Sequence, residues 1–119
     1  MPFPIVLGIP PDTTPEILKK LRADIIREVA HAMSISPDTV RPFFPTDIIG
    51  RPSEGEDTTI YCRIDTGEYF KKDDARAAKE QVTSVVANLI SATFGSKYDV
   101  EVFIGDLDPE SKTYLKDRF

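Results

Sequence analysis

The side-chain types that most often carry chemistry are scarce in this sequence, which has one cysteine and one histidine. Cys62 has no second cysteine with which to form an internal disulfide, and it lacks the partners of a zinc site. His31 is the only histidine, so a Ser-His-Asp arrangement or a multi-histidine metal site lacks the residues that it requires. From these residues we expect neither a metal ion nor a cofactor.

Charge along the chain is mixed in sign. The 119 residues include 15 Lys and Arg and 20 Asp and Glu, which gives a formal net charge of −5. Basic and acidic residues are interleaved, as in Lys71–Asp74 and Lys112–Arg118. Since a nucleic-acid-binding protein concentrates its positive charge on one face, we expect no nucleic-acid partner.

The N-terminal stretch argues against two further classes. Residues 1–11 contain four prolines, no basic region and no apolar run of useful length. They have the features of neither a secretory signal peptide nor a membrane span. We therefore expect a soluble, cytoplasmic protein with no membrane partner. The length is that of one domain, so we expect residues 1–119 to form a single domain.

The elements that must position any site alternate between strand and helix. Phe3–Ile9 is expected to form a short strand, ended by Pro10-Pro11. Thr14 is a favourable N-cap for the helix that follows, which Ser36-Pro37-Asp38 is expected to end. The apolar residues of this helix recur at three- and four-residue steps: Ile17, Leu18, Leu21, Ile25, Ile26, Val29, Ala30 and Met33.

A second strand is expected at Thr39–Phe44, followed by a loop over residues 46–57. Pro42 and Pro45 remove backbone donors and indicate a sheet edge or a bulge.

The second half of the chain repeats this order. Thr58–Asp65 is expected to be a strand with one buried face, because it alternates between Ile60, Cys62, Ile64 and Tyr61, Arg63, Asp65. A helix capped by Asp73 or Asp74 and ended by Gly95 follows. The alternation over Val100–Ile104 then predicts the last strand, and Asp108–Phe119 is a polar tail.

The resulting order is β-α-β, loop, β-α-β. One interpretation is an α/β (α+β) fold of two tandem β-α-β units, with parallel pairing inside each unit, in a four-stranded mixed sheet with two helices on one face. The ferredoxin-like split β-α-β fold, whose sheet is antiparallel, has the same order of elements. Periodicity does not separate the two.

A resemblance to a known family favours the first fold. Met1-Pro2 before a short apolar strand resembles the start of tautomerase superfamily members. Ile25–Met33 is similar to the first helix of 4-oxalocrotonate tautomerase, and Val40-Arg41 resembles the opening of its second strand. Val29–Phe44 follows the corresponding stretch of macrophage migration inhibitory factor (MIF), while Val100–Asp106 and the terminal Phe119 resemble an uncharacterised bacterial two-repeat branch. The two-repeat members form trimers, so the resemblance implies a homotrimer.

The resemblance also implies chemistry. Family members lose the initiator Met, which would make the nitrogen of Pro2 a secondary amine. An α-amino group titrates at about 7.7–8.0, and an apolar pocket moves that pKa down. A neutral amine removes a proton beside a carbonyl and returns it elsewhere, as in keto–enol tautomerisation of a small 2-keto or enol carboxylic acid.

The resemblance extends to the substrate-binding residues. Arg41 matches a substrate-binding arginine of 4-oxalocrotonate tautomerase, which would hold a substrate carboxylate. Arg63 is a second candidate because of its place on the less apolar strand face, and Phe103 would supply a hydrophobic wall. The competing interpretations are a solvated Arg41 and an Arg63 paired across strands with Glu101.

Several positions depart from the family pattern. Asp12 and Ile35 stand where relatives have an arginine and a lysine, and Pro4 interrupts the first strand. A chain that keeps Met1 would have an amide nitrogen at Pro2, which is not basic. We therefore hold two hypotheses, an isomerase that uses Pro2 and a catalytically silent tautomerase-fold trimer with a structural or ligand-binding role.

Overall fold

The computed structural model describes residues 2–45, 59–66 and 75–106, except for the side chains of residues 75 and 106. Its elements are, in chain order, β1 (Phe3–Leu7), α1 (Pro15–Met33), the 3₁₀ helix η1 (Pro37–Thr39), β2 (Thr59–Thr66), α2 (Ala75–Phe94) and β3 (Asp99–Asp106). The expected loop at 46–57, the capping residues Asp73 and Asp74, and the tail from Asp108 lie outside the described residues. In the described part, no helix is long and apolar enough to cross a membrane.

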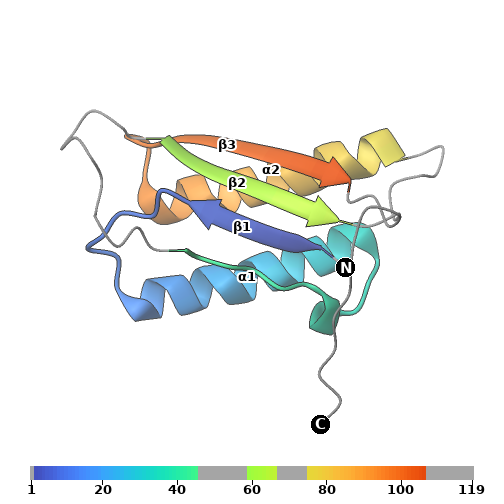
Figure 1. Ribbon diagram of the computed structural model, residues 1–119, viewed down its shortest axis with the longest axis horizontal. Helices are drawn as coiled ribbons and strands as arrows, with labels where there is room; N and C mark the ends of the chain where they lie inside the picture. The colour runs from blue at the N-terminus through green and yellow to red at the C-terminus, as the bar shows by residue number, and fades with distance from the viewer. Residues whose placement is uncertain (1, 46–58, 67–74, 107–119) are drawn as a thin grey trace, which may run out of the picture.

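The sheet has the strand order β1-β2-β3. β1 pairs with β2 in antiparallel fashion, and β2 pairs with β3 in parallel fashion. Figure 1 shows α1 and α2 on the same side of this sheet. The fold is therefore a mixed α+β arrangement with helices on one face, as predicted. The parallel pairing of β2 with β3 excludes the antiparallel ferredoxin-like alternative.

The strand expected at Thr39–Phe44 is not a full strand, so the prediction of four strands is not confirmed. The chain forms η1 and then contributes one parallel bridge between Ile5 and Phe43. Three backbone hydrogen bonds join it to β1: Arg41 N to Pro2 O (3.2 Å), Phe43 N to Pro4 O (2.8 Å) and Val6 N to Phe43 O (2.9 Å).

Two prolines explain why this pairing is short. Continuing the pattern, the next bond would run from the nitrogen of residue 4 to the carbonyl of residue 41, but Pro4 has no N–H to donate. Pro42 is tolerated because its nitrogen alternates away from β1, toward the sheet edge. Pro4 thus weakens the ladder from inside the sheet, while Pro42 discourages pairing on the outer side.

The helix ends follow the predicted caps. The Thr14 side chain accepts a hydrogen bond from Ile17 N at 3.4 Å, and Pro15 occupies the first turn of α1. α1 ends at Met33, where Ser34 adopts a left-handed conformation with φ of 54°. α2 ends at Phe94 and is followed by Gly95, whose φ is 93°. The predicted helix end near Ser36 was therefore slightly late, whereas Gly95 is confirmed.

Strand bounds differ from the predictions by a few residues. β1 stops at Leu7, two residues before Ile9, because Gly8 has a φ of 87° that breaks the extended backbone. β3 extends beyond Val100–Ile104 to cover Asp99–Asp106, since parallel pairing with β2 continues over that length.

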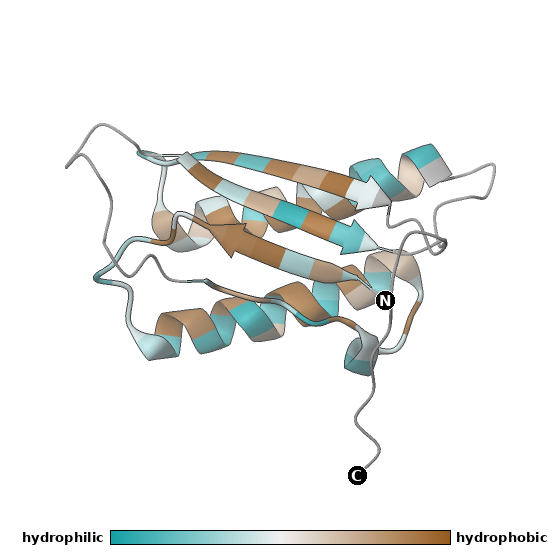
Figure 2. Ribbon diagram, viewed as in Figure 1, coloured by the Kyte–Doolittle hydropathy of each residue, from teal (hydrophilic) through white to brown (hydrophobic). Residues whose placement is uncertain are grey.

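The core lies between the helices and one face of the sheet. Cys62 is fully buried in it, as predicted, and burial raises the pKa of its thiol to about 12. Figure 2 shows apolar residues alternating with polar ones along β2. The other buried core residues are Val6, Leu21, Ile25, Val29, Ala30, Met33, Val40, Ile60, Ile64, Val82, Val86 and Ile90.

Candidate functional site

Pro2 lies immediately before β1 and is less than 2% exposed. It shares the buried side of the chain with Pro4 and Val6, because alternate residues of an extended strand point to the same face. Its carbonyl oxygen accepts the hydrogen bond from Arg41 N. The candidate base is therefore held at one end of the sheet, in surroundings from which water is largely excluded.

Arg41 is exposed and lies between two buried residues, Val40 and Pro42. The bridge between Ile5 and Phe43 places Arg41 next to Phe3, on the sheet face that the helices leave uncovered. Within the described residues, no acidic side chain forms an ion pair with Arg41.

Arg63 and Phe103 are directly opposite each other in the register of β2 and β3. The alternative in which Arg63 pairs with Glu101 is not the pairing that the structure shows, because the register places Glu101 opposite Tyr61 and Arg63 forms its ion pair with Asp65. Arg63 instead donates from Nη2 (2.9 Å) and Nε (3.1 Å) to Oδ2 of Asp65, two residues away on the same strand face. This pair already engages part of the guanidinium group.

The uncovered side of the sheet carries a group of apolar side chains that we call the open face. Its exposed members Leu7, Phe43, Tyr61 and Phe103 are between 41% and 54% exposed. Phe3 and Ile5 complete it, and the rings of Phe3 and Phe43 lie 6.4 Å apart. An apolar patch of this kind on a sheet face is typical of a protein–protein contact.

A single chain does not assemble all four predicted site residues. Arg41, Arg63 and Phe103 belong to the same sheet face as the open face, whereas the Pro2 ring belongs to the helix-facing side. Only the backbone contact between Pro2 and Arg41 joins the two groups. Any site that uses Pro2 with one of these arginines therefore needs a second chain or a different position of the terminus.

Thr66, at this end of the sheet, was not predicted from the sequence. Its side chain is fully buried, and among the described residues Oγ1 is buried without a hydrogen-bond partner. The predicted strand ended at Asp65, one residue too early. The alternation of Ile60, Cys62 and Ile64, continued by one step, would have placed a hydroxyl on the buried face.

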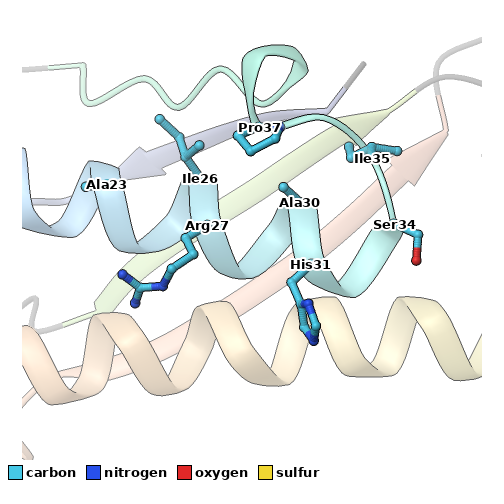
Figure 3. Close-up of a pocket in the computed structure, with 8 residues that line it drawn as sticks. All are labelled: Ala23, Ile26, Arg27, Ala30, His31, Ser34, Ile35 and Pro37. Carbon is cyan, nitrogen blue, oxygen red and sulfur yellow. The ribbon is translucent and has the colours of Figure 1, made fainter.

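A groove with a volume of about 670 Å³ lies elsewhere, between α1 and the segment that follows it. None of the four predicted site residues lines it. Figure 3 shows Arg27 and His31 pointing away from the segment that carries Ile35 and Pro37. Arg27 already forms ion pairs with Asp24 (3.1 Å) and Glu28 (3.3 Å). The groove thus lacks converging groups that would perform chemistry.

Comparison with known proteins gives structural relatives only. The sequence matches no protein-family model and no curated protein. A MIF-like protein from Entamoeba histolytica superposes with a TM-score of 0.67 at 12% identity, over 99% of this chain and 96% of its own. A fused 4-OT, described as an asymmetric trimer, gives a TM-score of 0.66 at 16% identity, over 88% of this chain and 85% of its own.

A third solved structure is similar at the same level. Pt0534, in a form inactivated by 2-oxo-3-pentynoate, gives a TM-score of 0.60 at 15% identity, over 88% of this chain and 85% of its own. At these identities the likeness concerns the fold. The chain has the fold of the tautomerase superfamily, in agreement with the resemblance found in the sequence.

Proposed function

We propose that this protein is a tautomerase-like isomerase that interconverts keto and enol forms of a small 2-keto carboxylic acid. In this proposal residues 1–119 form one domain, Met1 is removed, and Pro2 is the general base. The observation that carries the proposal is the burial of Pro2 at the first strand of a tautomerase fold. No metal or cofactor is required for this proton transfer.

Burial suits Pro2 for the role of base. Once Met1 is cleaved, the nitrogen changes from an amide into a secondary amine that is able to accept a proton. Low exposure disfavours the ammonium form and moves the pKa below the usual 7.7–8.0 of an α-amino group. The amine would then be largely neutral near pH 7, where a general base is most effective.

Arg41 is the better of the two arginines to hold the substrate carboxylate. It has no acidic partner among the described residues, whereas Arg63 is bound to Asp65. A free guanidinium group offers two parallel donors to a carboxylate, a strong and directional arrangement. Arg63 and Phe103 would then form the adjacent wall of the pocket.

Assembly would bring these residues to Pro2. We infer a homotrimer in which the open faces pack around a common axis, so that Arg41 and Phe103 of one protomer approach Pro2 of the next. Covering a half-exposed aromatic side chain of the open face contributes about 2–3 kcal/mol. Phe43, Tyr61 and Phe103 each offer this gain.

The first experiment is an intact mass measurement of the native protein, which shows whether Met1 is absent. The processed protein is then assayed for ketonisation of phenylpyruvate enol and of 2-hydroxymuconate. The matched control carries one extra N-terminal residue, which keeps the Pro2 nitrogen an amide. If this control ketonises the enols as fast as the processed protein, Pro2 is not the base.

Two substitutions separate the base from the carboxylate anchor. Pro2→Ala leaves a primary amine and should reduce kcat by tens- to hundreds-fold, within the roughly 10²–10⁴ range of general-base catalysis. Arg41→Ala should raise KM for carboxylate substrates by about 10- to 100-fold, the equivalent of one charged hydrogen-bonding group. Arg63→Ala should raise this KM less than Arg41→Ala does. If Arg63→Ala raises it more, Arg63 and not Arg41 binds the substrate carboxylate.

A covalent probe tests the nucleophilicity of Pro2 without turnover. The relative Pt0534 is inactivated by 2-oxo-3-pentynoate, an electron-poor alkyne to which a neutral amine adds. The Pro2 nitrogen forms a bond to C4, the alkyne carbon that carries the methyl group and lies β to the ketone; the nitrogen loses its proton and C3 gains one, so the whole probe is added. The processed protein should gain the mass of one probe molecule on its N-terminal peptide, and the extended control should not.

The second candidate function is a catalytically silent trimer with a structural or ligand-binding role. The open face favours it independently of Pro2, because the apolar side chains there gain from assembly whether or not a reaction occurs. A trimer with no activity above buffer on several enols, and with no labelling of Pro2, would establish this alternative.

A further inference from the structure

An acidic side chain on the same side of the sheet as the open face is not used by the proposed function. Asp65 Oδ2 accepts two hydrogen bonds from Arg63, one from Nη2 at 2.9 Å and one from Nε at 3.1 Å. The Asp65 side chain is 16% exposed, whereas that of Arg63 is 63% exposed. Asp65 therefore engages one side of the guanidinium group of Arg63 and balances its charge.

The register places Asp65 within a row of residues that crosses the sheet. Phe3 is opposite Asp65 on β1, and Gly105 is opposite it on β3. Arg41 is next to Phe3 on the other side, because the chain after η1 pairs with β1. Two strand spacings of about 4.8 Å each therefore separate the backbones of Arg41 and Asp65.

The charges of this row favour an anion at one end only. Arg41 has no acidic partner among the described residues, whereas the charge of Arg63 is balanced by Asp65. A Cβ added at Gly105 would lie 3.4 Å from Asp65 Oδ1, so this oxygen lies over a position of β3 that has no side chain to cover it. A carboxylate bound by Arg41 thus has an aromatic side chain and then an acidic one as its next neighbours.

This order of side chains distinguishes two classes of 2-keto acid. The apolar body of a monocarboxylate would lie against Phe3 and Phe103 and gain from being removed from water. The second carboxylate of a dicarboxylate, directed along the same row, would approach Asp65, and like charges repel each other strongly where water is scarce. It would also find the guanidinium group of Arg63 already engaged.

We propose that Asp65 determines the specificity of the proposed site, by restricting it to 2-keto acids with a single carboxylate and an apolar body. The inference rests on the proposed function for the place of Arg41 in the site, but not on the role of Pro2 as the base. Asp65 acts in two ways: it repels a second carboxylate, and it occupies the donors of Arg63 that would otherwise bind that carboxylate.

Asp65→Asn removes the charge and keeps the size of the side chain. The variant should fold, because an ion pair as exposed as this one contributes little to stability. A ligand that gains one charged hydrogen-bonding partner binds about 10- to 100-fold more tightly. Asp65→Asn should therefore improve the binding of a dicarboxylate, relative to that of a monocarboxylate, by this factor. Damage to the structure would weaken both ligands and would not produce such a gain.

Glu101→Gln is the matched control. Glu101 is on the same side of the sheet but opposite Tyr61, while Phe103 is opposite Arg63. The substitution changes the net charge by the same amount as Asp65→Asn and leaves the pair of Arg63 with Asp65 intact. The preference for a monocarboxylate should therefore stay near the wild-type value.

The test uses isothermal titration calorimetry on the full chain with Met1 removed. The probes are 3-phenylpropanoate, which has one carboxylate and an apolar body, and adipate, which has two carboxylates. Wild type should bind 3-phenylpropanoate more tightly than adipate, and Asp65→Asn should reduce or reverse this preference. The proposal is overturned if wild type does not prefer 3-phenylpropanoate, or if Asp65→Asn and Glu101→Gln have the same preference.

Turnover gives a separate readout, the ratio of kcat/KM for phenylpyruvate enol to that for 2-hydroxymuconate. This ratio should fall in Asp65→Asn by about the same 10- to 100-fold. A binding preference that Asp65→Asn removes, in a protein that ketonises neither enol, refutes the proposed function alone. Ketonisation with the same ratio in wild type and Asp65→Asn refutes only the role of Asp65.

Discussion

A charge placed on the open face tests the assembly directly. Phe103 is 54% exposed in the single chain and lies opposite Arg63 on β2. Phe103→Glu keeps the strand intact, because the new carboxylate has Arg63 as a cross-strand partner, an interaction of about 0.2–1 kcal/mol. In the trimer, however, the same position would bring a carboxylate into an apolar contact.

The magnitude follows from the area that Phe103 exposes. Its side chain would bury roughly 110 Å² on assembly, worth about 2–3 kcal/mol per protomer. Each trimer contains three copies of the substitution, so its free energy of dissociation changes by three times the value per protomer. The protein concentration at half-dissociation varies as the square root of the trimer dissociation constant. The concentration at half-dissociation should therefore rise by about two to three orders of magnitude, before any cost of burying the charge.

Sedimentation velocity over a wide range of protein concentration measures this midpoint. The matched control is Ile17→Glu, since Ile17 is 42% exposed but lies in the first turn of α1, outside the sheet. An acidic residue is favourable at that position, so the control should assemble like wild type. A wild-type protein that is monomeric throughout, or a Phe103→Glu protein that dissociates no more readily than Ile17→Glu, would refute the reasoning.

Two further predictions concern stability. Ser34 and Gly95 end their helices with φ of 54° and 93°, so Ser34→Gly should stabilise the protein and Gly95→Ala should destabilise it. Each substitution should change the free energy of unfolding by about 1 kcal/mol, measured by urea denaturation at fixed protein concentration. An added Cβ at Gly95 would meet no neighbouring atom, so any loss of stability there would come from backbone strain. A Gly95→Ala protein as stable as wild type would contradict this explanation. Burial raises the pKa of Cys62 to about 12 from the ordinary 9.0, so the unfolded chain loses this proton first as pH rises. Wild type should therefore lose stability more steeply than Cys62→Ala between about pH 9 and 11, by up to about 1.4 kcal/mol per pH unit, and parallel curves would show that the thiol does not contribute.

Much of the fold could be predicted because local rules and packing agree. The 3.6-residue spacing over α1, the alternation along β2 and the cap residues Thr14 and Gly95 all specify the elements that the structure contains. The strand expected at Thr39–Phe44 failed because Pro4, a residue distant in sequence, removes a donor from the ladder that would have extended it. Which residues of two strands face each other depends on the tertiary fold, so the local sequence around residues 39–44 does not show that Pro4 lies opposite them.

The candidate site was less predictable for the same reason. One interpretation paired Arg63 with Glu101 across the strands, but the register places Phe103 opposite Arg63, and Arg63 pairs with Asp65 on its own strand. Alternation gives the face of each side chain, whereas cross-strand neighbours depend on register. Thr66 was missed because its importance arises from burial and from the absence of a partner among the described residues, and neither property is visible in a residue type.

The division of the candidate residues between the two sides of the sheet links assembly to catalysis. Pro2 is buried toward the helices, where low exposure would lower the pKa of the proposed base. Arg41 is exposed beside apolar residues of the open face, where its charge is hydrated unless a neighbouring chain covers it. A carboxylate is held more strongly by a guanidinium group from which water is excluded. Under the proposed function, one protomer would supply the base and its neighbour would supply the arginine that binds the substrate carboxylate. A dissociated chain would then keep a titratable amine but bind the carboxylate only weakly, so loss of activity on dilution should parallel dissociation of the assembly.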